Sequence, residues 1–292
     1  MGGLEEGRVF LSALHNPYQN LALEHGLFQS LPAPSLFLYT NAPCVVIGRA
    51  QNPWVEANLP FMQMQHIPLV RRQSGGGTVV HDLGNLNFSF ISPKAQHNKT
   101  QNLQIILHAL QRLGIPAEMN ERHDLILQGK KISGSAFRET RNNCFHHGTL
   151  LIDADLPMLR EALAAPPRSI RTNAVKSVRS SVMNLRDFNS VLSLQQIQAE
   201  IIQSFLQYHK IQLTSVILGL AALDHPLIQA EYNLYQSHEW LYHKTLPFEE
   251  HIDINGQAVK ITVENGVITH CQPLLPQCSA WIKRDFSLWS LK

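Results

Sequence analysis

The sequence has little net charge, few cysteines and no long apolar run. Its 292 residues carry 24 Lys and Arg against 22 Asp and Glu, so no strong field favours nucleic acid or a membrane surface. Four cysteines without a CxxC pair argue against a disulfide framework and fit a reducing compartment. No apolar segment is long enough to span a bilayer, and residues 1–17 lack a signal-peptide core. We expect a cytoplasmic protein, or a mitochondrial-matrix protein in a eukaryote, that binds neither nucleic acid nor membrane.

Hydrophobic spacing predicts a mixed α+β chain. A helix should begin after the cap Asn16 with Pro17 in its first turn. Short apolar runs at 36–39 and 44–47, separated by turn residues, predict two strands paired with each other. The alternation in 86–90 predicts a strand with one buried face. Further helices are predicted at 100–113, 155–165 and 193–209, the last with a capping box from Ser193 to Gln196.

The end of the chain differs in character from the rest. After about residue 240 the sequence alternates with period two around Asn255-Gly256 and Asn265-Gly266, which are hairpin turn signals. We therefore predict two domains, 1–240 and a short accessory domain 241–292. Residues 166–185 have no clean period and are rich in small and basic side chains, so we expect a long mobile loop there.

The segment RRQSGGG, from Arg71 to Gly77, contains three consecutive glycines, which are conformationally flexible, shortly before a predicted strand. Three fixed glycines cost conformational entropy, and the usual reason is that a ligand approaches the backbone closely or an anion is bound by successive N–H groups. The segment matches neither the Walker A loop nor GxGxxG. A glycine-rich hairpin turn without any ligand is an equal alternative on spacing alone.

The segment HDLILQGKKISGSAF predicts a tight hairpin around Gly129. It would bring Asp124 and Lys131 onto one face, where the pair could serve magnesium together with a phosphate or carboxylate. An exposed surface pair is the alternative. The small residues 133–136 are unusual in a strand unless another group packs closely against them.

Four motifs carry a resemblance: RRQSGGGTVVHDLGNLNFSF, KKISGSAFRE, FHHGTLL and SVRSSVMNL. In this order and approximate spacing they resemble the lipoate-protein ligase A and mitochondrial lipoyltransferase family, over about residues 15–190. The resemblance implies a catalytic domain with the α+β biotin/lipoate ligase fold and a small α+β C-terminal accessory domain. It implies that ATP activates lipoate to lipoyl-AMP, and that the lipoyl group then passes to a lysine of a carrier domain.

The resemblance also assigns residues. Lys131 would be the catalytic residue, an electrostatic catalyst that binds the lipoate carboxylate and the α-phosphate, and Asp124 would hold Mg²⁺. The residues expected to bind ATP and lipoyl-AMP, besides Lys131, are Arg72, Ser74, Gly75, Gly76, Gly77, Thr78, Val79, Val80, Arg138, His147, Gly148, Thr149, Lys176, Ser177, Val178 and Arg179. Within this set, Arg72 would offset phosphate charge, Arg138 would contact the lipoyl group, and 176–179 would close over the adenylate.

The expected partners are apo lipoyl domains of 2-oxoacid dehydrogenase E2 subunits and the glycine cleavage H protein, with the enzyme as a monomer. Two features favour a transferase that takes a pre-activated or protein-bound acyl group without ATP: His123 where bacterial ligases carry Asn, and the SIRTNA run at 169–174. The tail is also shorter than the accessory domain of long bacterial ligases. A non-catalytic binder of lipoyl carrier domains is another alternative.

One cysteine and one histidine pair raise further hypotheses, a thiol mechanism and a metal site. Cys144 as a nucleophile would indicate an octanoyltransferase with a thioester intermediate, although a buried, idle thiol is the commoner case. His146 and His147 should point to opposite faces of a strand and so cannot share a metal.

Overall fold

The computed structural model describes residues 8–286. The prediction that the chain begins without a signal peptide falls partly on residues 1–7, and the predicted accessory domain ends in 287–292, both outside the described residues. In the described part, no helix is long and apolar enough to cross a membrane.

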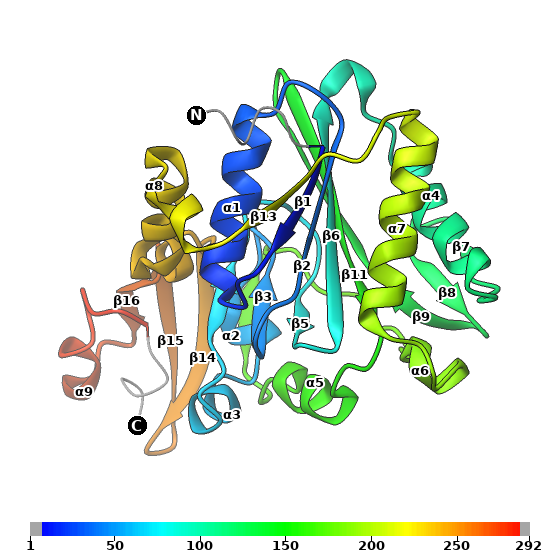
Figure 1. Ribbon diagram of the computed structural model, residues 1–292. Coiled ribbons are helices and arrows are strands. Elements are labelled where there is room, and N and C mark those ends of the chain that lie inside the picture. The colour runs from blue at the N-terminus through cyan, green and yellow to red at the C-terminus, as the bar shows by residue number, and fades with distance from the viewer. Residues whose placement is uncertain (1–7, 287–292) are drawn as a thin grey trace.

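A mixed six-stranded sheet forms the centre of the molecule (Figure 1). Its five strand pairings are antiparallel in the three that start from one edge and parallel in the two at the other edge. Its strands, in spatial order, are β10 (Ser135–Glu139), β11 (Asn143–Leu151), β6 (Asn85–Pro93), β2 (Ser35–Tyr39), β1 (Val9–Ser12) and β13 (Ser215–Leu218).

Helices cover both faces of this sheet. On one face lie α4 (Lys99–Arg112) and α7 (Leu194–His209), and on the other lie α1 (Pro17–Ser30) and α8 (Pro226–Gln236) (Figure 1). Side chains of β2 alternate between the two cores: Leu36 and Leu38 pack with α4 and α7, whereas Phe37 packs with α1. The predicted helices at 17–31, 100–113 and 193–209 are confirmed, and so are the Asn16 cap and the Ser193–Gln196 capping box.

The strand β6 is buried on both faces, so the prediction of one buried face is wrong. Leu86, Phe88 and Phe90 enter the core under α4 and α7. The alternate residues Asn87 and Ser89 are 2% and 0% exposed, because α1 and the loops beside it cover the second face. Asn87 on this covered face lines a cavity instead of facing solvent.

The predicted pairing of 36–39 with 44–47 is also wrong. Both strands form, but β3 (Cys44–Ile47) lies in a separate three-stranded sheet between β4 (Leu69–Arg71) and β5 (Val79–His81). The connecting residues are fastened to the start of α1: Ala42 N donates to His15 O, and Asn20 Nδ2 donates to Thr40 O. The chain therefore crosses from one sheet to the other instead of turning back on itself.

The predicted hairpin around Gly129 is confirmed. It consists of β8 (Leu125–Leu127) and β9 (Lys130–Ser133), with β7 (Glu118–Met119) paired to its outer side. Gln128 and Gly129 have φ of 49° and 74°, the pair of positive values that a tight type I′ turn requires. Lys131 is thereby fixed on the strand that follows the turn.

The C-terminal region forms a four-stranded sheet of β12 (Ile170–Thr172), β14 (Phe248–Ile254), β15 (Gln257–Glu264) and β16 (Val267–Gln272). The hairpin turns predicted at Asn255-Gly256 and Asn265-Gly266 are both present. The edge strand β12 comes from the segment predicted to be a loop. That segment is also attached at its other end, where Lys131 N donates to Ser181 O at 2.9 Å, so it is not free along its length.

Short helices complete the chain. In one of them, Trp54 packs on Phe248 and Phe286, and this contact joins the C-terminal sheet to the rest of the molecule. The remaining elements are α2 (Pro53–Glu56), α3 (Leu59–Met64), η1 (Lys94–Gln96), α5 (Leu156–Leu163), α6 (Leu185–Phe188), η2 (Leu220–Asp224), the π-helical turn η3 (Glu239–His243) and α9 (Pro276–Ser279).

Candidate active site

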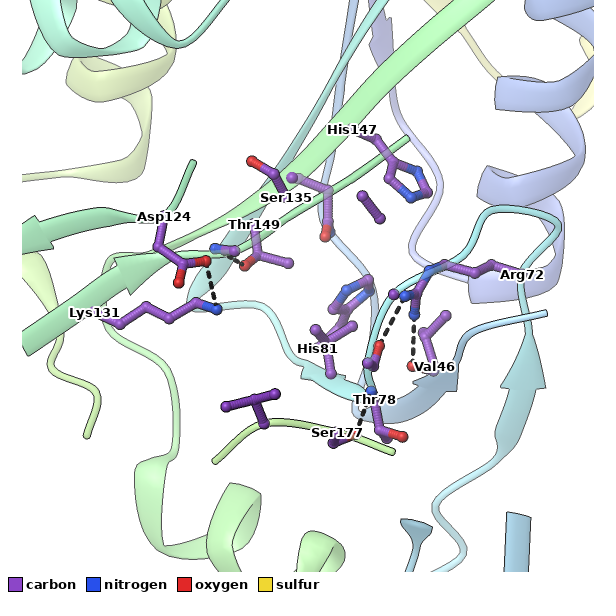
Figure 2. A pocket seen from close by; sticks show the side chains of 18 of the residues that line it. Val46, Arg72, Thr78, His81, Asp124, Lys131, Ser135, His147, Thr149 and Ser177 are labelled. Carbon is purple, nitrogen blue, oxygen red and sulfur yellow. Dashed lines mark hydrogen bonds and ion pairs between the residues drawn. The ribbon is translucent and has the colours of Figure 1, made fainter. Parts of the chain in front are cut away.

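A cavity of about 340 Å³ lies between the glycine loop, the β8–β9 hairpin, the β10–β11 edge of the large sheet and residues 175–178. Figure 2 shows Lys131 and Asp124 on one side of it and Arg72 and His147 on the other. The structure brings together most of the residues predicted from sequence. Those that line the cavity are Arg72, Gly76, Gly77, Thr78, Val79, Asp124, Lys131, His147, Gly148, Thr149, Lys176, Ser177 and Val178.

Lys131 and Asp124 form an ion pair, with Nζ 2.8 Å from Oδ1. The hairpin brings Lys131, on β9, close to Asp124, which directly precedes β8, and the side chain of Lys131 is 26% exposed. Gly134 makes room for the ammonium, because a Cβ at that position would lie 3.1 Å from Nζ. The pair is thus at the cavity wall with the ammonium still accessible, and the alternative of a solvated surface pair is excluded.

Arg72 braces the glycine loop. Its guanidinium donates to Val46 O, Ser74 Oγ, Gly75 O and Gly77 O at 2.6–3.1 Å. Burial lowers the pKa of this guanidinium to about 10, which leaves it charged at neutral pH. These bonds fix two carbonyls of the loop, those of Gly75 and Gly77, and they account for the order of a segment whose Gly76 adopts a φ of +86°.

A buried hydrogen-bond chain runs from the cavity wall to α1. Arg72 Nε donates to Ser74 Oγ, Ser74 Oγ lies 2.8 Å from His147 Nε2, and His147 Nδ1 lies 3.0 Å from both carboxylate oxygens of Glu24. The order Ser–His–Glu is that of a hydrolase triad. Ser74, however, is 1% exposed and does not line the cavity. The chain therefore orients His147 and the loop and offers no accessible nucleophile.

Ser177 fastens the 175–179 segment over the glycine loop. Its Oγ donates to Glu56 and accepts hydrogen bonds from Thr78 N at 2.8 Å and Gln51 Nε2 at 3.0 Å. Its backbone N–H also donates to the Glu56 carboxylate. A Cβ at Gly77 would lie 3.1 Å from Ser177 Oγ, so the absence of a side chain in the loop permits this closure. Sequence reasoning missed Glu56, which sits at the end of a four-residue helix.

A second cavity of about 690 Å³ continues from the first one. The two share Lys131, Gly134 and residues 176–178. Val80 and Arg179, which do not line the first cavity, line the second together with Arg160. Lys131 thus stands where two connected compartments meet, and cationic side chains continue into the second one.

Arg138 lies outside both cavities. Its Nη1 donates to Gln73 Oε1 and lies 2.9 Å from His25 Nδ1, and its guanidinium lies over the ring of Phe28. Burial, together with the positive charge of Arg138, lowers the pKa of His25 to about 3. The predicted lipoyl contact of Arg138 stays a prediction. Ser74, which is buried, and Gly75, which is exposed, also lie outside both cavities.

The histidine and thiol hypotheses can be placed on the structure. His146 and His147 point to opposite faces of β11, as predicted: His146 contacts Ser135 and Phe137, and His147 faces the cavity. Cys144 is buried and lines neither cavity, and burial raises the pKa of its thiol. It therefore does not serve as the nucleophile of a thioester mechanism in this cavity.

Sequence reasoning also missed the far wall of the first cavity. Two of these residues, Tyr39 of β2 and Asn87 of β6, lie on the strand face that the sequence does not predict to be buried. They can be recognised as cavity residues only when both faces of these strands are known to be covered. The additional lining residues are Leu21, Tyr39, Val46, His81, Asn87, Arg122 and Val175, and the cavity is also lined by Gly134, Ser135 and Ala136 of the predicted small-residue run. His123, next to Asp124, has φ of +61°, a conformation that Asn adopts more readily than His.

Residues 16–206 match the Lipoyl protein ligase A/B catalytic domain. The chain is 40% identical over 254 residues to "Lipoate-protein ligase A" of Psychrobacter cryohalolentis, covering 84% of this chain and 75% of that protein. It is 37% identical over 283 residues to "Putative lipoate-protein ligase A" of Schizosaccharomyces pombe, with 90% and 78% covered.

Solved structures agree in fold. LipL1 of P. falciparum in complex with lipoate superposes with a TM-score of 0.73 at 25% identity, over 97% of this chain and 92% of that one. A lipoate-protein ligase A bound with ATP superposes with a TM-score of 0.70 at 26% identity, over 80% and 98%. A bipartite ligase from Thermoplasma acidophilum, described with its E2 lipoyl domain, gives a TM-score of 0.70 at 26% identity, over 81% and 96%.

Proposed function

Because this chain belongs to the lipoyl protein ligase A/B catalytic-domain family, we propose that it is an ATP-dependent lipoate-protein ligase. It joins lipoate to AMP with release of pyrophosphate, and then transfers the lipoyl group to a lysine of a lipoyl domain with release of AMP. The observation that carries the proposal is the position of Lys131 between two connected cavities. One compartment suits the acyl chain and the other suits the nucleotide.

The first cavity fits an acyl chain that ends in a carboxylate. Leu21, Tyr39, Val46 and Val79 give its wall an apolar part, where the chain of lipoate loses contact with water. The carboxylate end is directed to Lys131, the accessible cation of the Lys131–Asp124 pair. The oriented His147 at the opposite side (Figure 2) gives the far end a polar boundary.

The second cavity fits the nucleotide. Lys176 and Arg179, with Lys131 at its mouth, supply the positive charge that a polyphosphate requires. Mg²⁺ binds through one or two carboxylates together with substrate phosphates, and Asp124, a buried carboxylate that lines the first cavity beside Lys131, suits that mode. We assign Mg²⁺ to Asp124, where the ion would neutralise phosphate charge.

The chemistry proceeds in two steps on this frame. A lipoate carboxylate oxygen attacks the α-phosphorus, and the bond from that phosphorus to pyrophosphate breaks. Lys131 holds both anions close together and stabilises the charge that develops. The acceptor lysine amine then attacks the carbonyl of lipoyl-AMP, loses a proton and displaces AMP. Ser177, held down by Glu56, keeps the segment over the cavity closed and limits hydrolysis of the mixed anhydride.

We also propose the partners and the domain division. Lipoyl domains are the acceptors in general, supported by the related ligase described with its E2 lipoyl domain. We extend this to E2 subunits of 2-oxoacid dehydrogenases and to the glycine cleavage H protein, and we propose that the enzyme acts as a monomer. Residues 1–240 form the catalytic unit and 241–292 the accessory unit, with β12 reaching from the first into the sheet of the second.

Intact-mass analysis of an apo lipoyl domain tests the function. The domain is incubated with the protein, lipoate and Mg²⁺, with and without ATP. A lipoyl adduct that requires ATP confirms the ligase. An adduct only from supplied lipoyl-AMP would show a transferase without activation, and no adduct in either case would leave a binder of carrier domains. AMP and pyrophosphate, quantified in the same samples, report the first step separately.

A further inference from the structure

Within residues 8–286, three metal-ligating side chains meet on the surface far along the chain from the catalytic residues: His238, His243 and Asp285. Each offers one ligand atom, and these atoms all lie within 4.8 Å of one another. His243 Nε2 is 2.8 Å from Asp285 Oδ1. We propose that these three residues bind a transition-metal ion of the Zn²⁺ type.

The two histidines are brought together by an unusual turn. They are five residues apart in HEWLYH, a spacing that would put them on different sides of an α-helix. Residues 239–243 instead form a π-helical turn, in which residues five apart succeed each other along one face. The imidazole centroids are accordingly 5.1 Å apart. The π-turn therefore places two histidines that are five residues apart on the same face. An α-helix places residues four apart on one face in the same way.

The carboxylate is positioned from a different part of the chain. Asp285 forms an isolated antiparallel bridge with Val267, and Phe286 N donates to Gly266 O at 2.7 Å. The backbone that carries the carboxylate is thus fixed to the start of β16. Both the turn and this segment border one hollow of about 400 Å³, which His238 and Asp285 line together with Trp54.

The ligand set selects the kind of ion. Two imidazoles and one carboxylate suit Zn²⁺, whereas Mg²⁺ and Ca²⁺ prefer oxygen ligands throughout. Bonds of about 2.0–2.1 Å in a tetrahedral site put ligand atoms roughly 3.3 Å apart. His243 and Asp285 are already that close, and closing the remaining gap requires rotation of His238, which is exposed. Three protein ligands leave one coordination position for water.

The ion would join the segment of Asp285 to the π-turn, and the π-turn also reaches the glycine-loop region. The π-turn is bonded to Arg71: Trp240 Nε1 donates to Arg71 O, and Arg71 donates to Leu241 O at 2.7 and 2.9 Å. A metal bound at His238, His243 and Asp285 ties this turn to the end of the C-terminal sheet. Its binding therefore stabilises the folded chain by mass action, since the unfolded chain does not hold these ligands together.

Zinc binding to the full chain, without an affinity tag and after treatment with a chelator, tests the site directly. Equilibrium dialysis with metal analysis, in millimolar Mg²⁺, should give one tight equivalent of Zn²⁺ and a rise in the melting temperature. His238→Ala and His243→Ala should each weaken that equivalent by at least the roughly 10–100-fold that loss of an outer-shell partner causes.

Matched controls make the outcome decisive. His251→Ala removes an exposed histidine of the same sheet and should bind Zn²⁺ as the unaltered chain does. Co²⁺ added in place of Zn²⁺ should give the intense visible bands of a four-coordinate ion, lost in His238→Ala. The absence of a tight equivalent in the unaltered chain, or its full retention in the folded double variant of His238 and His243, overturns the proposal.

Discussion

The ammonium of Lys131 lies 2.8 Å from the carboxylate of Asp124 across the β8–β9 hairpin, at the wall where two cavities meet. Asp124 is buried, so Lys131 is the accessible member of the pair. The ammonium is thereby held on a rigid strand at a fixed place. An electrostatic catalyst needs this preorganisation, because it must face charge that develops only in the transition state.

Lys131→Ala should abolish lipoylation while the protein stays folded. Removing the cation takes away stabilisation of the charge on the phosphates, and we expect a loss of roughly 10²–10³-fold or more. The exposed neighbour Lys130 is the matched control, and Lys130→Ala should retain activity. Intact mass of the lipoyl domain and pyrophosphate release measure both. Unchanged turnover of Lys131→Ala would remove this residue from the mechanism.

Glu56→Gln should uncouple the two steps. The carboxylate of Glu56 accepts from both the backbone N–H and the hydroxyl of Ser177, and an amide satisfies these two donors less well. Loss of about 1.4 kcal/mol of closure corresponds to a tenfold larger open population. We expect more AMP released per lipoyl domain modified, whereas Glu118→Gln, at an exposed position, should keep the wild-type ratio. A ratio near one in both variants would contradict the closure role.

Arg71→Met should strongly destabilise the fold. Arg71 is 0% exposed, and it donates to Leu241 O, Thr245 Oγ1, Arg49 O and Gln51 O. The substitution leaves buried carbonyls without donors, at a cost of about 3 kcal/mol or more. Urea unfolding should show this loss, and Arg141→Met, at an exposed position, should not. A change under about 1 kcal/mol would show that Arg71 is not a structural brace.

Stability should fall in mild acid, in part through His81. Burial, followed by the electrostatic effect of Arg72 and His147, lowers the pKa of His81 from 6.5 to about 3. Between these two values the unfolded chain binds the proton and the folded chain does not, so the free energy of unfolding falls as pH drops below 6.5 and is unaffected above it.

His81→Gln should flatten this dependence by up to about 1.4 kcal/mol per pH unit. Urea midpoints measured between pH 7 and pH 5 provide the test. His108→Gln removes an exposed histidine of α4 and should leave the slope as it is. Equal slopes in the His81 variant and the unaltered protein would show that His81 does not contribute.

Local sequence determined much of the architecture and part of the site. The caps at Asn16 and Ser193 and the turn residues Gln128 and Gly129 act within a few residues, so their outcome could be predicted. The hairpin turn brings Asp124, directly before β8, near Lys131 on β9. The order of the motifs in the sequence was sufficient to indicate the family and the acyl-ligase chemistry. In the structure, most of the predicted site residues line one cavity.

Tertiary structure decided what depends on distant partners. The strand β3 does not pair with β2 because hydrogen bonds to α1 hold the residues that connect the two strands. The polar face of β6 is buried because helices cover both faces of the sheet. Glu56 became a latch for Ser177 only through a contact across 121 residues. Likewise, the ligand atoms of His238 and His243 lie close to each other because the chain forms a π-turn between them. Local propensity carries no information about such contacts, because the free energy that fixes them comes from groups far apart in the chain.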